Sequence, residues 1–236
     1  MPLPSLSPRI LLPVVAALAL LACSPAPAPP AVAPAPAAQG EKELALYRTL
    51  REQGSWEYAA PIGKEIVERY PASAAATEVA ATLAETTARA EAQVTRRRLE
   101  RLWSYQSGTE SGGQQVSASI YSDGGVAAER VRLVLRRHSD WGQSVYLYGS
   151  GKGFVCRGNC RIEAHFDAAP RKLAAYRPDT GEPALFIADD KDFIARLSRA
   201  QVIRMDVVEQ DRGKRSLTFE VGGFDAAKFP PLARGK

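Results

Sequence analysis

The chain has 236 residues, of which 31 are Lys or Arg and 26 are Asp or Glu, so its formal net charge is +5. Hydrophobic residues make up 45% and charged residues 24%, which is ordinary for a folded protein. This length allows one or two domains with hydrophobic cores. The composition excludes wholesale disorder, a collagen-like chain and a polytopic membrane protein.

The N-terminus has the features of an export signal. Ile10 to Leu21 is a 12-residue run that is apolar throughout, interrupted only by Pro13, and Arg9 supplies one positive charge before it. Crossing a bilayer takes about 20 apolar residues, so this run is too short to span one. It therefore predicts a secretory signal peptide over residues 1–22.

The apolar run ends in Leu20-Leu21-Ala22-Cys23, which resembles the lipobox of bacterial lipoproteins. The resemblance implies cleavage before Cys23 and acylation of this residue, which would anchor the protein to a membrane without a spanning helix. Ser24 follows the cysteine where inner-membrane lipoproteins commonly have aspartate, so the resemblance implies the outer membrane. The alternative is ordinary signal-peptidase cleavage near Cys23, which would leave a free thiol.

Residues 23–40 are predicted to be the lipidated cysteine and a tether. Positions 24–40 contain seven Ala, six Pro and no charge. Proline fixes the backbone and removes hydrogen-bond donors, so we expect an extended segment of about 50 Å. The alternative is a proline motif that an aromatic groove of a partner recognises.

Helical periodicity runs through residues 41–102, with breaks at Gly54 and at Tyr70-Pro71, and so predicts three helices. Pro61 is expected to kink or delay the second helix. Residues 44–85 resemble one tetratricopeptide-type helical hairpin, which implies a spacer, since a peptide-binding groove needs several stacked repeats. The resemblance rests on Leu50, Gly54, Trp56, Ala59, Ile66 and Tyr70-Pro71-Ala72-Ser73.

A cluster of arginines ends the predicted helical region. Residues 41–102 hold ten basic and ten acidic side chains, so the cluster is not part of a basic domain. Cations also favour the C-terminus of a helix. We therefore interpret Arg96, Arg97, Arg98 and Arg101 as a solvated helix end and expect no binding of nucleic acid.

From residue 103 to residue 236 the hydrophobic period changes to 2. Apolar residues alternate with polar ones in runs bounded by glycine-rich turns, as in Val116 to Ile120 and Val131 to Leu135. About eight such strands predict an antiparallel β-sandwich or a barrel-like domain. One short helix is expected over Asp189 to Ala200, with Asp189 or Asp190 as its N-cap. The predicted fold class is thus α+β.

Cys156 and Cys160 flank a three-residue segment between two strand patterns. Across a hairpin such residues face each other closely enough for a disulfide, and exported proteins meet an oxidising compartment. A redox pair would favour a two-residue spacing. A zinc site would need His138 and His165 as further ligands, although strand alternation places His165 on the face opposite Cys160. We predict a disulfide and no metal.

Enzyme signatures are weak. The segment Gly149 to Gly153 lacks the earlier glycine and the Ser or Thr after lysine that a phosphate-binding loop needs, and no helix is expected after it. Neither a nucleophile elbow nor a zinc-protease motif occurs in the sequence. The sequence therefore predicts a non-enzymatic protein without a cofactor.

Binding is the remaining class of function, and Trp141, Tyr146 and Tyr148 are its candidate contacts. Both tyrosines point away from Val145 and Leu147 if the segment is a strand. Equally, these side chains could form a second packed layer. We expect an adaptor or structural lipoprotein that binds an envelope protein or peptidoglycan. The alternative is an inhibitor or immunity lipoprotein, which small β lipoproteins with a disulfide broadly resemble.

Overall fold

The computed structural model describes residues 40–233. The predicted signal peptide 1–22, Cys23 and the tether up to residue 39 lie outside the described residues. Among the helices that are described, none is both long enough and apolar enough to span a membrane.

Three helices form the first part of the described chain, as predicted: α1 (Glu41–Glu52), α2 (Trp56–Arg69) and α3 (Ala74–Leu102). Their contact surface buries Leu44, Ile66 and Val79. The expectation that Pro61 delays the second helix is wrong. Helix α2 begins at Trp56 and continues through Pro61 to Arg69, so the proline removes only its own hydrogen bond within the helix.

The arginines at the end of α3 are largely paired with carboxylates. Three of the four make ion pairs, one within α3, one to α2 and one to the last strand of the sheet. Their partners leave little positive charge unbalanced at this helix end. The pairs are Arg96–Glu100, Arg97–Glu57 and Arg98–Glu220.

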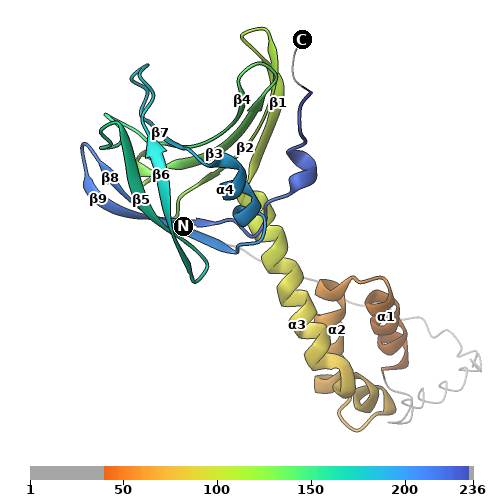
Figure 1. Ribbon diagram of the computed structural model, residues 1–236. Coiled ribbons are helices and arrows are strands. Elements are labelled where there is room, and N and C mark those ends of the chain that lie inside the picture. Colours follow the sequence, from red (N-terminus) through yellow and green to blue (C-terminus); the bar gives the residue numbers. More distant parts are fainter. Residues whose placement is uncertain (1–39, 234–236) are drawn as a thin grey trace, which may run out of the picture. The chain divides into compact units, whose positions relative to one another are not determined.

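Nine antiparallel strands follow in a single open sheet with β1 and β9 at its edges, and together with the helices they confirm the α+β class (Figure 1). The strand order is β1-β2-β3-β4-β7-β6-β5-β8-β9. The strands are β1 (Ser104–Glu110), β2 (Gly113–Tyr121), β3 (Arg132–His138), β4 (Gly142–Tyr148), β5 (Asn159–Phe166), β6 (Ala169–Tyr176), β7 (Ala184–Ile187), β8 (Val202–Glu209) and β9 (Gly213–Glu220).

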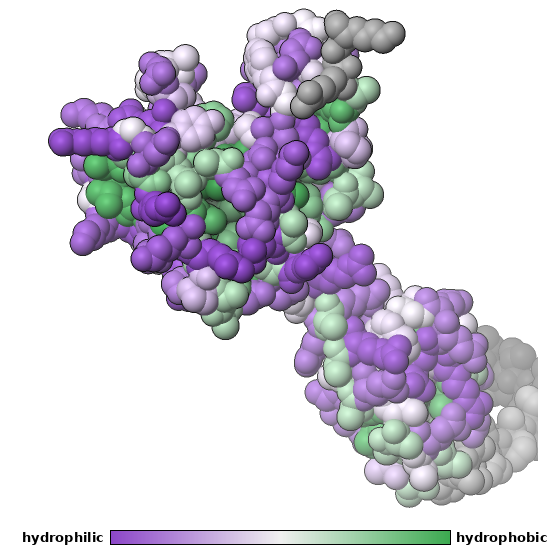
Figure 2. All heavy atoms as spheres, in the orientation of Figure 1, coloured by the Kyte–Doolittle hydropathy of each residue, from purple (hydrophilic) through white to green (hydrophobic). Residues whose placement is uncertain are grey.

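The sheet curves around helix α4 (Asp190–Leu197) and buries its inner face there (Figure 1). Alternation places Leu133 and Leu135 of β3 on that face, and Phe193 and Leu197 of α4 belong to the same core. The predicted N-cap is confirmed at Asp189, whose Oδ1 accepts a hydrogen bond of 3.2 Å from Asp192 N. In Figure 2 the hydrophobic residues visible on the surface gather mainly on the sheet, while the three helices are mostly hydrophilic.

The period-2 pattern did not predict β1, β6 and β7. Strand β1 is an edge strand with six of its seven residues exposed, β6 buries only two side chains and β7 has four residues. The expectation that a strand pattern precedes the segment between Cys156 and Cys160 is wrong, because the described chain has no strand between β4 and β5. Phe154 makes one isolated bridge to Glu209 and is fully buried in the core, so its segment lies as a loop beside the end of β8.

Candidate binding face

The outer face of the sheet, opposite the core, carries the three predicted contact residues. Tyr146 and Tyr148 alternate with the buried Val145 and Leu147 on β4, as predicted. Trp141 lies in the turn between β3 and β4. The structure thus brings the three side chains to one face of the β3–β4 hairpin, with Trp141 at its turn and Tyr148 at the opposite end of β4.

Tyr146 belongs to an aromatic row across three strands. Register pairs it with Phe186 of β7, which in turn pairs with Tyr176 of β6. The Tyr146 and Phe186 ring centroids are 4.9 Å apart, and those of Phe186 and Tyr176 are 5.4 Å apart. Tyr146 is half-buried, so the alternative of a second packed layer describes this residue, whereas Trp141 is 51% and Tyr148 38% exposed.

Two arginines of β3 that the sequence analysis did not single out complete this face. The Arg132 guanidinium lies 5.6 Å from the ring centroid of Tyr148, and that of Arg136 lies 5.3 Å from Trp141 and 5.6 Å from Tyr146. These are cation–π distances. Alternating arginines opposite alternating tyrosines on the next strand are the sequence signal that could have identified them.

Burial raises the pKa of Tyr146, while the positive charges of Arg136 and Arg132 act in the opposite direction. The phenol therefore remains a neutral group that both donates and accepts hydrogen bonds at neutral pH. Neither arginine forms an ion pair with any described carboxylate. Both are half-buried, so this face holds positive charge that the described residues do not balance.

A polar pocket of about 170 Å³ opens beside these arginines. Ser117 and Ser119 of β2 and Val134 of β3 form its floor, since they share the outer face at neighbouring register positions. Glu110 is the acidic residue of its lining. We call this cavity the serine-floored pocket; its lining is Gln106, Glu110, Gln115, Ser117, Ser119, Arg132, Val134, Arg136 and Tyr146.

The turn that carries Trp141 is held by His138. The Nδ1 atom of this buried imidazole accepts hydrogen bonds from the backbone N–H groups of Asp140 (3.2 Å) and Trp141 (3.3 Å). Its Nε2 atom then carries the proton and donates to the carbonyl of Glu110 at 2.9 Å. The rings of His138 and Trp141 stack 3.9 Å apart. His138 thus has a structural role that orients Trp141.

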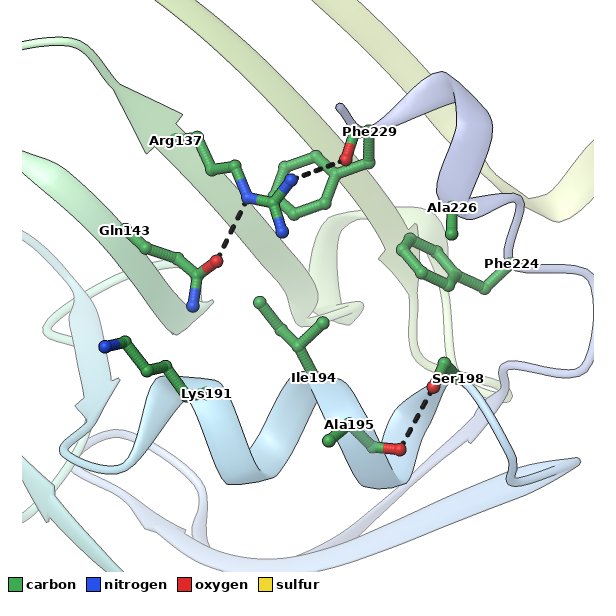
Figure 3. Close-up of a pocket in the computed structure, with 9 residues that line it drawn as sticks. All are labelled: Arg137, Gln143, Lys191, Ile194, Ala195, Ser198, Phe224, Ala226 and Phe229. Atoms are coloured by element: carbon green, nitrogen blue, oxygen red, sulfur yellow. Dashed lines mark hydrogen bonds between the residues drawn. The ribbon is translucent and has the colours of Figure 1, made fainter. Parts of the chain in front are cut away.

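A second candidate is an apolar groove of about 320 Å³ between α4, β3–β4 and the C-terminal segment (Figure 3). Ile194, Phe224 and Phe229 supply its apolar walls. Arg137 donates to the carbonyl of Phe229 at 2.7 Å and to Gln143 Oε1 at 3.0 Å. Burial lowers the pKa of Arg137, against the opposing effect of Asp190. Through these contacts Arg137 holds the C-terminal segment against the β3–β4 hairpin.

Cys156 and Cys160 are at disulfide distance, with their Cα atoms 5.5 Å apart. They do not face each other across a hairpin, because Cys156 lies in the loop before β5 and only Cys160 belongs to that strand. Among the described residues, no three metal-ligating side chains of the His, Cys, Asp or Glu type come together.

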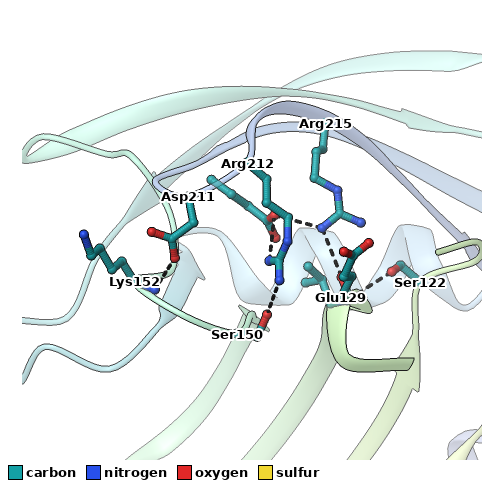
Figure 4. A network of polar contacts seen from close by, with 9 residues as sticks. Ser122, Glu129, Ser150, Lys152, Asp211, Arg212 and Arg215 are labelled. Carbon is teal, nitrogen blue, oxygen red and sulfur yellow. Dashed lines mark hydrogen bonds and ion pairs between the residues drawn. The ribbon is translucent and has the colours of Figure 1, made fainter. Parts of the chain in front are cut away.

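The glycine-rich segment before β5 is a tight turn bound to the β8–β9 hairpin (Figure 4). The backbone N–H of Lys152 donates to Asp211 Oδ2 at 2.8 Å, and Arg212 donates to Ser150 Oγ at 3.0 Å. Gly153 has φ +73°, and a Cβ there would lie 2.6 Å from Pro183 Cα. Close backbone contact therefore accounts for this glycine.

Comparison with known proteins identifies no family. No protein-family model matches the sequence, and no curated protein matches it significantly. Among solved structures, the chain is similar to invasion-associated protein B from Bartonella henselae, with 16% sequence identity and a TM-score of 0.38 over 53% of this chain and 87% of that one. A similarity at this TM-score supports no conclusion about function.

Proposed function

We propose that this protein is a lipid-anchored lipoprotein of the outer membrane that faces the periplasm and binds another envelope component without catalysing a reaction. The observation that carries the proposal is the outer face of the sheet. There Trp141 and Tyr148 are exposed beside the half-buried Arg132 and Arg136. Aromatic residues and arginine are the side chains most enriched at binding hot spots.

The arrangement along the chain suits presentation of such a face. An acylated Cys23 followed by about 50 Å of extended Pro/Ala-rich chain would let the folded part reach a component at a distance from the membrane. The three helices α1–α3 then act as a spacer. The basic cluster at the end of α3 is not proposed as a contact, because three of its four arginines pair with Glu57, Glu100 and Glu220.

Lipidation is tested by metabolic labelling with palmitate. We expect the wild-type protein to incorporate the label and Cys23→Ser to abolish incorporation, since the thiol of Cys23 is the proposed acceptor. The mutant should remain unprocessed at the lipobox and so keep the mass of the signal peptide. Labelling of the mutant at the wild-type level would contradict the anchor.

Binding by the outer face is tested by capture from detergent extracts of the cell envelope with the full-length protein as bait. We expect Tyr146→Ala/Tyr148→Ala to weaken capture by about 1–2 kcal/mol, as truncation of aromatic anchors usually does. Tyr58→Ala is the matched control, because Tyr58 is a 66% exposed tyrosine on α2, away from this face. Thermal melts check that all variants are folded.

Equal capture by the double variant and the wild type would remove this face from the proposal. Hydrolysis of purified peptidoglycan by the wild-type protein would overturn the non-enzymatic part. The alternative role, an inhibitor or immunity protein, predicts a different result. In that case the protein would protect cells or peptidoglycan against an added hydrolase and capture no component of its own envelope.

A further inference from the structure

We infer that the serine-floored pocket binds an acidic sugar unit, so that the envelope component recognised by the outer face is a glycan bearing carboxylates. This inference rests on the proposed binding function and names its ligand class. It follows from what the pocket lining offers and from what that lining leaves unpaired.

The pocket first requires a negative charge on its ligand. The Arg132 guanidinium makes neither a hydrogen bond nor an ion pair to any described residue, and it lies 5.6 Å from the ring centroid of Tyr148. Arg136 donates from Nε to Ser144 Oγ at 3.2 Å, which leaves both of its terminal nitrogen atoms free to donate to a ligand. Planar guanidinium groups match carboxylate oxygens with paired hydrogen bonds. Both arginines line the pocket and are half-buried, so an anion there would be partly shielded from water.

The lining also limits the size of that charge. Two arginines and Glu110 are its charged residues, which gives a net charge of +1. A carboxylate, with one negative charge, balances this lining, whereas a phosphate monoester carries about −1.5 to −2 at neutral pH. Glu110 forms no ion pair with either arginine within the described chain, so its oxygens are available to accept from ligand hydroxyl groups.

The second requirement is a hydrogen-bond donor on the ligand. Gln115 Oε1 is buried and accepts no hydrogen bond from the described residues. Leaving a buried acceptor unpaired costs free energy that a ligand hydroxyl would recover. Ser117, Ser119 and Gln106 add further donors and acceptors around the same space. A plain carboxylate would satisfy the arginines but not these groups.

The pocket is small, and this limits how much of a ligand it holds. Its volume of about 170 Å³ is below the range of about 300–1,000 Å³ typical of pockets for drug-sized ligands. It therefore suits one sugar-sized unit, with the rest of the polymer outside. The exposed ring of Tyr148 and the aromatic row of Tyr146, Phe186 and Tyr176 lie where neighbouring units would pass.

The test is titration calorimetry of the full-length protein in detergent with three acidic probes: trigalacturonate, a hyaluronan hexasaccharide and N-acetylglucosaminyl-N-acetylmuramic acid. We expect at least one to bind. The methyl ester of the bound probe, which keeps the hydroxyl groups but loses the charge, should bind at least about tenfold more weakly, because each charge-assisted hydrogen bond is strong. Acetate, which has the charge without the hydroxyl groups, should not compete.

Variants assign the binding to the pocket. Arg132→Gln/Arg136→Gln should weaken binding of the probe by at least about tenfold, since this double variant removes both charged donors. Arg161→Gln/Arg204→Gln is the matched control, because it removes the same charge from exposed arginines of β5 and β8 and should bind within about twofold of wild type at 150 mM salt. Ser117→Val serves as a second test if the arginine variant does not fold. It fills the floor of the pocket, keeps both arginines and should weaken binding of the probe.

Several results would overturn the inference while leaving the proposed function intact. One is the absence of binding to all three probes when envelope capture still depends on Tyr146 and Tyr148. A second is equal binding by the Arg132/Arg136 and Arg161/Arg204 variants. A third is loss of envelope capture after protease treatment of the extract, which would identify an acidic protein as the partner instead of a glycan.

Discussion

Phe193→Ala is expected to lower the free energy of unfolding by about 3–5 kcal/mol, the cost of removing a large aromatic side chain from a packed core. Phe193 is 0% exposed and is the residue of α4 that packs edge to face on Phe166 of β5, with ring centroids 5.3 Å apart. Because α4 packs inside the curved sheet, we expect the strands not to close the cavity that the substitution leaves, so its full cost should be measured. Denaturant unfolding followed by tryptophan fluorescence measures the loss.

The matched control for this prediction is Phe186→Ala. Phe186 is also a phenylalanine of the sheet part, but it lies half-buried on the outer face between Tyr146 and Tyr176. We expect its replacement to cost clearly less stability and to weaken envelope capture instead. If both variants lost the same stability, the assignment of one residue to the core and the other to a binding face would be wrong.

Glu209→Ala is expected to have the second large effect, about 3 kcal/mol, at the low end for breaking a buried ion pair. The Glu209 side chain is 3% exposed, and its Oε2 atom accepts from Arg215 at 2.8 Å and from Arg212 at 3.3 Å. Arg215 also donates to the carbonyl of Glu129 at 3.0 Å, and Arg212 to Ser150 (Figure 4). The carboxylate therefore joins the end of β8 to two loops.

A double-mutant cycle separates the ion pair from loss of packing. Arg215→Met removes the closer cation and keeps most of the apolar side chain. The cost of Glu209→Ala should be smaller in that background, since one of the two cations it leaves unpaired is already gone. Strictly additive losses in chemical denaturation would show that Glu209 does not act through Arg215. An unchanged midpoint for Glu209→Ala alone would contradict the structural role of this network.

Local pattern determined much of the fold. The breaks at Gly54 and Tyr70-Pro71 predicted three helices, because glycine and proline end helices for reasons that act within a few residues. Alternation on β3 likewise predicted which side chains enter the core, since the side-chain period of a strand is 2. The helix start at Asp189 and the proximity of Cys156 to Cys160 are equally short-range features.

The candidate site depended on tertiary structure for most of its residues. Tyr146 and Tyr148 could be proposed from alternation on one strand, but Phe186 and Tyr176 join them only because β7 and β6 pair next to β4, out of chain order. The serine-floored pocket likewise combines β1, a polar strand without alternation, with β2 and β3.

The sequence by itself therefore determined the fold class, the three helices, the core face of most strands and the prediction of an exported, lipidated protein. Tertiary structure decided the strand order, the burial of Glu209 and the convergence of Arg132, Arg136 and Gln115 on one pocket. The physical reason is that helix ends and strand faces depend on neighbours a few residues away. Strand pairing instead depends on contacts between distant segments, whose free energy no local period reports.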